Sequence, residues 1–332
     1  MNIAVAGSIA TDHLMTFHGK FADSLVPDQL DKIALSFLVD ELDIRRGGCG
    51  ANIAYGLAAL GQKPFLVAAV GDDFDELGYR DWLTESGVDC SYLCVSETLH
   101  TARCTITTDD SHAQIVTFYA GAMADARKID LGALSDEVGG IDLVLIGPDD
   151  PEAMLRHTEV CRERGIDFAA DPSQQLAWAD GDLIRQLIDG AAYLFSNDYE
   201  AALIERKTGW SAADVQAHVR TRVVTHGADG VRVYPADGDE ISVKAIEGVI
   251  AVDPTGVGDS FRAGFLAAVA AGLGLARAAQ VGCTVAASVV ETKGTQEYEL
   301  TRDGFAKRFS TAYGEEAAAE AVAALKLPSN TG

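Results

Sequence analysis

The sequence predicts an α/β protein with one mainly parallel sheet, helices on both faces of that sheet, and a second, smaller β-sheet inserted in the chain. Two observations support this fold class. From Pro64 onward, short apolar runs alternate with segments of helical periodicity, which is the βα repetition of a parallel sheet. In contrast, segments 14–46 and 101–119 contain short apolar strands with no helix between them. They indicate a small sheet whose exposed apolar face must cover a ligand, a second copy of the chain, or both.

The large sheet and its helices follow from this pattern in chain order. Its predicted strands are 3–7, 65–70, 143–146, 166–170, 193–196, 222–225 and 231–234. The predicted helices are 47–60, 74–86, 152–164, 183–188, 199–207, 261–273 and 315–325. Because parallel strands need crossover connections, these helices are expected on both faces of the sheet.

The small sheet is expected from strands at 14–17, 33–44, 101–108 and 113–119, with a turn at 109–111. We therefore expect residues 1–12, 47–100 and 120–332 to form the α/β core. Residues 13–46 and 101–119 are then a β-lid inserted in that core.

Composition limits the classes of function. The chain has 332 residues, of which 48% are hydrophobic and 23% charged, as in ordinary globular proteins. A formal net charge of −24 argues against non-specific nucleic-acid binding and against binding to anionic membranes. The N-terminus lacks the basic region of a signal peptide and no apolar run is long enough to span a bilayer, so we expect a cytoplasmic protein.

The cysteines point to the same compartment. They are Cys49, Cys90, Cys94, Cys104, Cys161 and Cys283. None forms a C-x-x-C pair, and we expect free thiols and no zinc site.

The clearest functional motif is the stretch 251–262, AVDPTGVGDSFR. Gly256, Val257 and Gly258 form a tight turn that opens the predicted helix, and its free N–H groups make an anion site. Asp259 follows at once. It either complements the helix dipole or takes a proton from a hydroxyl that attacks a transferring phosphoryl group.

A second motif runs from Gly47 to Gly61 as G-G-x-x-x-N-x-A-x-x-L-x-x-L-G. The paired glycines permit close backbone approach. Asn52 either caps the helix or offers its amide to two hydroxyls of a polyol. Ser8 and Asp12 follow the first strand, where ligands collect in such sheets, although turn chemistry explains them equally well.

Two further motifs lie at later strand ends. In the N-D-Y-E segment, Asn197 and Glu200 either cap a helix or hold magnesium. The segment T-H-G-A-D-G ends another strand in a glycine turn, at Thr225, Gly227 and Gly230. We assign no catalytic role to the histidine in this turn.

These motifs resemble one family. D-x-T-G-x-G-D-x-F at 253–261, the diglycine motif, and N-x-x-E between them resemble the ribokinase family of PfkB-type carbohydrate kinases, over residues 3 to about 313. The resemblance implies a ribokinase-like fold, ATP as donor, and Mg²⁺ held largely through water by Asn197 and Glu200. It also implies a monovalent cation such as K⁺ near Asp253, Thr255 and the loop 288–294.

Within the family, the chain is most similar to bacterial adenosine kinases. The segments that carry this similarity are 7–12, 35–39, 100–103, 118–119, 171–176 and 294–296. The similarity implies an acceptor site made of Ser8, Asp12, Ser36, Gly48, Asn52, Phe118, Gln174 and Gln175, with Asp259 as the base. It implies an ATP side made of Asn197, Thr225, Gly227, Gly230, Gly256, Val257 and Gly258. Cys104 departs from the pattern, because it stands where a second aromatic ring is expected to stack on the base.

The expected activity is transfer of the γ-phosphoryl group of ATP to the 5′-hydroxyl of adenosine. A sugar kinase of the ribokinase or fructokinase type is the alternative, and Cys104 favours it. A non-catalytic nucleoside or sugar sensor is disfavoured by Asp259 and Asn52, which a sensor does not need. The apolar face of the β-lid suggests a homodimer that forms through it, and a monomer whose lid rests on the ligand is the alternative.

Overall fold

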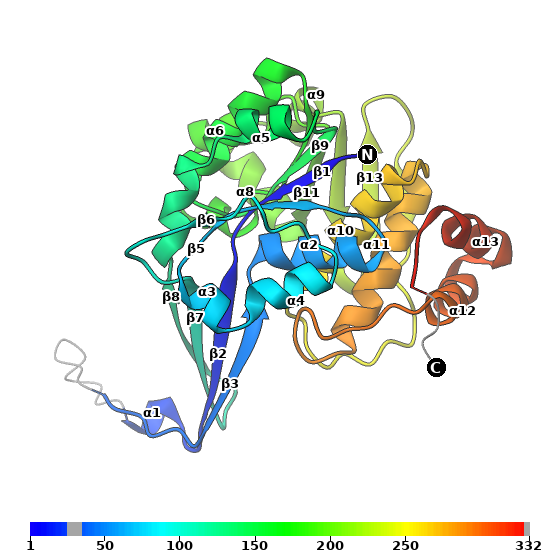
Figure 1. Ribbon diagram of the computed structural model, residues 1–332. Helices are drawn as coiled ribbons and strands as arrows, with labels where there is room; N and C mark the ends of the chain where they lie inside the picture. The colour runs from blue at the N-terminus through cyan, green and yellow to red at the C-terminus, as the bar shows by residue number, and fades with distance from the viewer. Residues whose placement is uncertain (25–34, 329–332) are drawn as a thin grey trace.

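A computed structural model describes residues 1–24 and 35–328, and its centre is an eight-stranded sheet (Figure 1). The strands are β1 (Ile3–Ala6), β4 (Phe65–Val67), β9 (Leu143–Ile146), β10 (Asp167–Ala170), β11 (Tyr193–Asn197), β12 (Thr221–Thr225), β13 (Val231–Pro235) and β14 (Ile241–Val243). Their order is β14-β13-β12-β11-β10-β9-β1-β4. Strand β13 runs opposite to the other seven strands of this described sheet, so the prediction of a mainly parallel sheet is confirmed.

Helices cover both faces of this sheet. One face carries α2 (Cys49–Ala59), α3 (Asp73–Glu76), α4 (Tyr79–Glu85), α10 (Val257–Ala270), α11 (Leu275–Val290), α12 (Arg302–Tyr313) and α13 (Glu315–Ala324). The other carries α5 (Leu131–Glu137), α6 (Pro151–Arg164), α7 (Gly181–Ile188), α8 (Asp198–Thr208) and α9 (Ala212–His218). Alternate strand residues face the two layers: Leu145 packs in the first core, and Val144 and Ile146 pack in the second.

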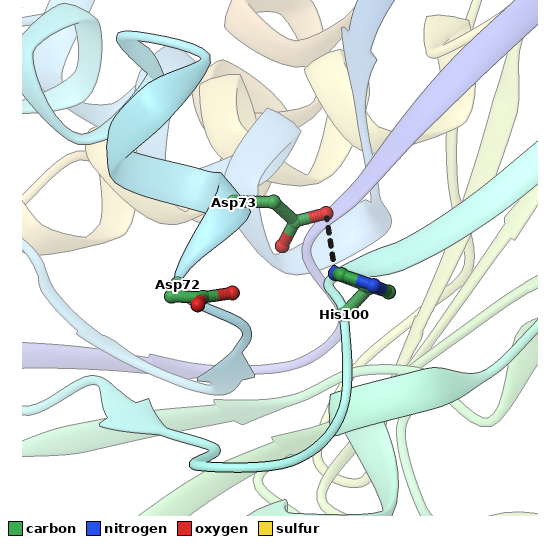
Figure 2. A group of neighbouring side chains, drawn as sticks. All are labelled: Asp72, Asp73 and His100. Atoms are coloured by element: carbon green, nitrogen blue, oxygen red, sulfur yellow. Dashed lines mark ion pairs between the residues drawn. The ribbon is translucent and has the colours of Figure 1, made fainter.

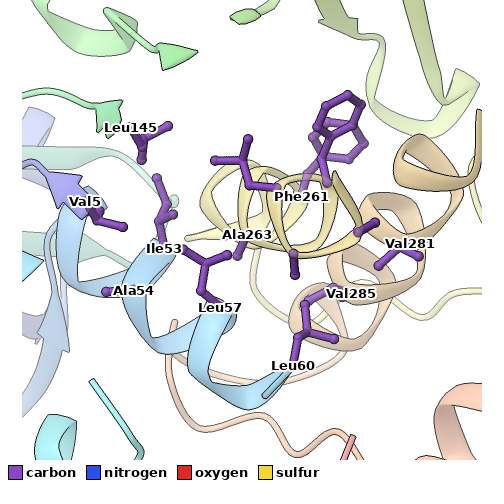
Figure 3. Close-up of a cluster of buried hydrophobic side chains, with 14 of the residues drawn as sticks. Val5, Ile53, Ala54, Leu57, Leu60, Leu145, Phe261, Ala263, Val281 and Val285 are labelled. Atoms are coloured by element: carbon purple, nitrogen blue, oxygen red, sulfur yellow. The ribbon is translucent and has the colours of Figure 1, made fainter. Parts of the chain in front are cut away.

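The contact between α2 and α10 brings together the two predicted signature motifs. Ile53 and Leu57 of α2 lie beside Ala263 of α10 in the first core (Figure 3). A Cβ atom added at Gly56 would stand only 2.6 Å from the Cβ of Ala263, so the helices approach as closely as a glycine allows. The N-terminal turns of both helices are thereby held at the same end of the sheet.

The second sheet has four strands, in the order β3-β2-β7-β8. They are β2 (Ala10–Phe17), β3 (Glu41–Gly47), β7 (Ala102–Asp109) and β8 (Gln114–Tyr119). This sheet projects from the core, with the short helix α1 (Phe21–Ser24) at its far end (Figure 1). Its exposed apolar side chains are Leu42, Ile44, Ile115, Val116, Phe118 and Tyr119. The small sheet forms as expected, and the exact boundaries of the lid remain a prediction.

Several predicted elements are wrong in detail. The expected strand 33–44 begins only at Glu41, and its first two residues lie outside the described part of the chain. The expected helix 74–86 is two helices, α3 and α4, because Gly78 between them has a φ of 64°. The expected strand 65–70 divides into β4 and β5 (Ala69–Val70), and β5 pairs with β6 (Cys94–Val95) in a separate ribbon. Helices α5, α9, α11 and α12 were not predicted.

The other general expectations can be checked directly. All six cysteines are free. Within residues 1–24 and 35–328, none of the helices combines the length and the apolar character needed to cross a bilayer.

A tight contact between α10 and α11 generates the first prediction. A Cβ at Gly264 would lie 2.9 Å from the Cα of Gly282. Gly264→Ala should therefore lower the free energy of unfolding by about 1–2 kcal/mol, because overpacking outweighs the better helix propensity of alanine. Urea denaturation measures this loss.

Gly132→Ala in α5 is the matched control, because its Cβ would meet only the flexible guanidinium of Arg164. This variant should unfold at the wild-type midpoint or above it. Equal losses in the two variants would show that the approach of α10 to α11 is not limiting.

Candidate active site

The described residues enclose a cavity of about 820 Å³ at the carboxyl ends of β11 and β12, beside the N-terminus of α10. Many of the predicted site residues line it together: Gln174, Asn197, Glu200, Thr225, Gly227, Gly230, Gly256, Val257, Gly258 and Asp259. Asn197 and Thr225 end neighbouring parallel strands. Ligands bind at this edge in open α/β sheets.

The opening of α10 is shaped for an anion. Gly256 has a φ of 73°, and a Cβ there would stand 2.8 Å from the side chain of Thr295. Both facts require glycine at this position. The first N–H groups of α10 have no acceptor within the helix, and Val257, Gly258 and Asp259 line the cavity. The positive end of the helix dipole therefore faces the cavity.

Asp259 sits on this first turn and is held by the other signature motif. Asn52 of α2 donates its Nδ2–H to Asp259 Oδ2 over 2.8 Å. Burial raises the pKa of Asp259 to about 6, although the Asn52 hydrogen bond and the Arg262 guanidinium oppose the rise. A carboxylate with this pKa is ionised at neutral pH and is a better proton acceptor than an ordinary aspartate.

Asp12 lies close to the same centre, on β2 of the small sheet. Its carboxylate packs on the diglycine motif, because a Cβ at Gly47 would be 2.6 Å from Asp12 Oδ2. Burial and the charges of Asp253 and Asp259 raise the pKa of Asp12 to about 6. The two signature motifs and the small sheet thus converge around two carboxyl groups.

The register of the small sheet places Cys104 and Phe118 beside Asp12. Asp12 is opposite Cys104, and Cys104 is opposite Phe118, so the three side chains share one face. Phe118 is 53% exposed. The position where a second aromatic ring was expected therefore faces Phe118 across the strand pair and holds only a thiol.

The diglycine motif contacts protein backbone. Gly48 has a φ of 92°, and a Cβ there would be 2.6 Å from Ser8 O. Ser8 O also accepts hydrogen bonds from Gly50 N at 2.9 Å and Ala51 N at 3.3 Å. The N-terminus of α2 is therefore closed by Ser8, whereas that of α10 opens into the cavity.

The predicted glutamine pair separates. Gln174 lines the cavity, and its Oε1 accepts a hydrogen bond from Cys49 Sγ at 3.6 Å. Gln175 instead donates from Nε2 to Asp149 O at 2.7 Å. Gln174 is thus the member of the pair that can meet a ligand in this cavity.

Ser36 lies apart from the cavity-lining residues. It is exposed, and the ring of the adjacent Phe37 packs on Phe17 and Phe21, with centroids 4.9 Å apart in each pair. This cluster is at the far end of β2 from Asp12. The structure therefore does not bring Ser36 to the other predicted site residues.

Asn197 and Glu200 form a capping box at the start of α8. Asn197 Oδ1 accepts from Glu200 N, and Glu200 Oε2 accepts from Asn197 N, each over 2.8 Å. Both residues also line the cavity. Because carboxylate oxygens have further lone pairs, this pair fits a magnesium ion bound through its waters. Its metal role remains a prediction.

Arg262 is a site residue that sequence reasoning missed. Its buried guanidinium holds Asp171 through Nε–Oδ2 at 2.5 Å and Nη2–Oδ1 at 2.8 Å, and donates to Gly258 O at 3.1 Å. This ion pair ties the first turns of α10 to the residue that follows β10. A charged residue inside the apolar stretch 261–273 was the available signal, because buried arginines need partners.

One cluster outside the cavity has metal-ligating residue types. Asp72, Asp73 and His100 lie together at the start of α3 (Figure 2). Asp73 Oδ1 already accepts from Thr101 N and Oγ1, and Asp73 Oδ2 is 3.5 Å from Arg103 Nη2. Asp73 Oδ2 makes no hydrogen bond among the described contacts, but the positive charge of Arg103 beside it disfavours a cation, so we assign no metal to the cluster.

The buried ion pair generates the second prediction. Arg262→Met leaves Asp171 buried without its counter-charge, and the free energy of unfolding should fall by about 3–5 kcal/mol. Denaturant titration measures the loss. The double variant Arg262→Met/Asp171→Leu should recover much of it, since the fully buried carboxylate is removed and only Glu200, 3.9 Å from Arg262, loses a partner.

Arg164→Met provides the matched control, because its pair with Asp136 is exposed. It should cost less than about 1 kcal/mol. A loss as small as this at Arg262 would contradict the inference that its ion pair fixes α10.

The cavity combines a helix N-terminus for an anion, a carboxylate of raised pKa beside it, and an adjacent sheet that carries a second carboxylate. Fold and site together define a phosphotransferase that acts on a hydroxyl acceptor. Comparison with known proteins identifies the group: the family model for pfkB family carbohydrate kinases matches residues 17–302. The chain belongs to this family and has the ribokinase-like fold.

Among the relatives and solved structures similar to this chain are nucleoside kinases and a ribokinase. The chain is 31% identical to a nucleoside kinase of Methanocaldococcus jannaschii, over 79% of this chain and 84% of the relative. It is 28% identical to the ribokinase of Bacillus subtilis, over 91% and 97%. Among solved structures, Burkholderia thailandensis nucleoside kinase in complex with inosine superposes with a TM-score of 0.82 at 35% identity, covering 94% of this chain and 98% of that one. The chain is therefore a kinase of the nucleoside and sugar branch of the family.

Proposed function

We propose that this protein is an ATP-dependent nucleoside kinase that phosphorylates the 5′-hydroxyl of adenosine. The observation that carries the proposal is the hydrogen bond from Asn52 to Asp259, because it joins the polyol motif to the base beside the anion site. The similarity to two nucleoside kinases, one of them solved with inosine, supports a nucleoside acceptor. Asp12 and Gly48, beside this pair, are assigned to the ribose.

Asp259 carries out the proton transfer in this proposal. Its carboxylate accepts the proton of the attacking 5′-hydroxyl. The N–H groups at 256–258 stabilise the negative charge that develops on the transferring phosphoryl group. The small sheet, with Phe118 and Cys104 on the face of Asp12, covers the acceptor and excludes water.

The ATP side is assigned to Asn197, Thr225, Gly227 and Gly230. Among the described residues that line the cavity, the carboxylates are Glu200, Glu247 and Asp259, and the single cation, Arg262, is paired with Asp171. A triphosphate therefore gains little from side-chain charge and depends on the helix dipole and on a divalent ion. Mg²⁺, held through water by Asn197 and Glu200, supplies charge neutralisation at the phosphates when bound.

A monovalent cation beside Asp253 is a further part of the proposal. Asp253 Oδ1 accepts from Thr255 N at 2.9 Å, and Oδ2 accepts from Gly294 N at 3.1 Å. The carboxylate thus links the segment that precedes α10 to the loop after α11. Backbone carbonyl oxygens and carboxylates are the ligand types that K⁺ would use beside Asp253.

A homodimer through the small sheet is also proposed. Leu42 and Ile44 of β3 and Ile115 of β8 are exposed, and sheet faces of this kind mark interfaces. Sedimentation of the wild-type protein measures the state directly.

A sugar kinase is the second candidate, and Cys104 is the observation that favours it. A thiol in place of an aromatic ring leaves Phe118 as the one ring in its row of the small sheet, which weakens stacking on a nucleobase. Similarity to the Bacillus subtilis ribokinase is consistent with this candidate.

An acceptor panel distinguishes the two. ATP-dependent phosphorylation is measured on adenosine, inosine, guanosine, ribose, fructose and fructose 6-phosphate. We expect the highest kcat/KM for adenosine. Preference for a free sugar would overturn the nucleoside assignment, and preference for inosine would keep it while changing the base.

Removal of the proposed base is the next prediction. Asp259→Asn should lower kcat at least about 100-fold, because the amide cannot accept the proton. The acceptor Kd should change little, since the amide oxygen can still accept from Asn52. Single-turnover kinetics and calorimetry measure the two quantities. Asp239→Asn, at an exposed position outside the cavity lining, is the control and should retain wild-type kcat.

A further inference from the structure

A chain of hydrogen bonds lies behind the proposed base. Asn52 donates to Asp259 Oδ2 at 2.8 Å. Asn52 Oδ1 accepts from Gln296 Nε2 at 2.9 Å. Gln296 Oε1 accepts from Trp82 Nε1 at 3.1 Å. The chain thus runs from α4 through the loop after α11 to α2 and ends on α10.

Chemistry fixes the direction of every bond in this chain. The indole N–H of Trp82 can only donate, so the amide oxygen of Gln296 must face it. The amide nitrogen of Gln296 then faces Asn52 and requires the oxygen of Asn52 as acceptor. The N–H of Asn52 is left to face Asp259. The Trp82 donor on α4 therefore favours the orientation in which the Asn52 N–H meets the carboxylate.

The other neighbours of these amides are the hydroxyl groups of Thr295 and Tyr79. Thr295 Oγ1 is 2.8 Å from Asn52 Oδ1 and 3.0 Å from Arg46 O. A hydroxyl both donates and accepts, so Thr295 can serve Asn52 in either orientation. Tyr79 OH donates to Gly47 O over 2.8 Å and accepts from Gln296 Nε2 over 2.6 Å, so it holds Gln296 in the same orientation as Trp82 does. It can serve the reversed amide only by giving up its bond to Gly47 O.

The donor and the relay are held rigidly. Gln296 is 0% exposed, so water cannot replace its partners. The Trp82 ring stacks on the Tyr55 ring with centroids 5.9 Å apart. The Arg46 guanidinium also lies over the Trp82 ring, 4.3 Å from the centroid of that ring. The indole is therefore fixed by packing on its ring, independently of the hydrogen bond that it makes.

We propose that Gln296, set in orientation by the Trp82 N–H, is a positioning residue that keeps the Asn52 N–H directed at Asp259 and so favours the ionised, proton-accepting carboxylate. This inference rests on the proposed function, in which Asp259 is the base. It adds two residues that touch neither the cavity nor the reacting atoms.

Other charged and titratable groups also act on Asp259. Arg262 and the nearby Cys49 favour its ionised form, while Asp171 opposes it. Asp12 and Tyr298 also interact with its charge. None of these groups is hydrogen-bonded to Trp82 or Gln296 among the described contacts, so a change at Trp82 leaves them in place.

The test uses Trp82→Phe, which keeps an aromatic ring between Tyr55 and Arg46 but removes the donor. When the Tyr79 hydroxyl turns from Gly47 O to Gln296, the amides of Gln296 and Asn52 can turn over. An amide oxygen facing Asp259 then disfavours its charge. The pKa of Asp259 should rise by at least about half a unit, at the lower end of what loss of one hydrogen bond produces. Carbon-13 NMR titration of the carboxyl measures it, with Asp259→Asn used to assign the signal.

Activity gives a second readout. General-base catalysis needs the ionised carboxylate, so the acid limb of the kcat profile should move to higher pH by the same amount. At high pH the ionised Asp259 itself attracts the Asn52 N–H, and kcat should return to the wild-type value. A purely structural role would lower kcat equally at all pH values, and that result would overturn the proposal.

Two further variants keep the test decisive. Gln296→Met removes the relay itself and should shift the Asp259 titration in the same direction. Tyr55→Phe is the matched control, because it alters the same aromatic stack but removes only a bond to Tyr298 O at 3.3 Å. An unchanged Asp259 pKa in both Trp82→Phe and Gln296→Met overturns the relay. A wild-type enzyme inactive on the whole acceptor panel overturns the proposed function, and the NMR titration still decides the relay.

Discussion

The arrangement of the site depends on the close packing of α2 against α10. This packing brings Asn52 of α2 within hydrogen-bond distance of Asp259 of α10. These residues are 207 positions apart. One turn further along each helix, Gly56 meets Ala263 with no room for a Cβ on the glycine. Because helix separation and side-chain contact are set by the same packing, a larger residue at Gly56 would move the base as well as the helix. The glycine is therefore part of the site, although it touches no ligand.

The cavity offers an anion no unpaired cationic side chain among its described lining residues. The chain carries a net charge of −24, and the cationic side chain in the cavity wall, Arg262, is engaged by Asp171. The opening of α10 instead presents N–H groups, which attract an anion without attracting the acceptor's hydroxyl proton. Burial near other carboxylates raises the pKa of both Asp12 and Asp259 to about 6. The same crowding that makes the site costly to fold gives Asp259 the raised pKa that suits the base we propose.

Sequence patterns predicted the site residues that lie at strand ends and helix starts, and they missed the contacts between residues far apart in the chain. The cavity residues at 256–259, Asn197 and Thr225 follow strand ends or open a helix, so chain order places them. The pairing of Arg262 with Asp171, and that of Asn52 with Gln296, joins positions far apart in the chain, and no local pattern encodes them. The prediction of one helix at 74–86 was wrong because the apolar periodicity continues through Gly78. The left-handed conformation of Gly78 divides this segment into α3 and α4. Gln174 and Gln175 were predicted as a pair, but a short 3₁₀ turn (Ser173–Ala177) directs only the first into the cavity.

The small sheet and the base share one set of contacts at β3. Gly47 O accepts from Tyr79 OH, and Arg46 O lies within hydrogen-bond distance of Thr295 Oγ1. The Arg46 side chain also rests on Trp82. The strand that carries the acceptor cover is thereby bonded to the residues that orient Asn52. A displacement of β3 would strain the contacts of Tyr79, Thr295 and Trp82 together. The position of the small sheet and the orientation of the amide facing Asp259 are therefore linked through packed contacts, with Gln296 buried and Trp82 half-buried behind them.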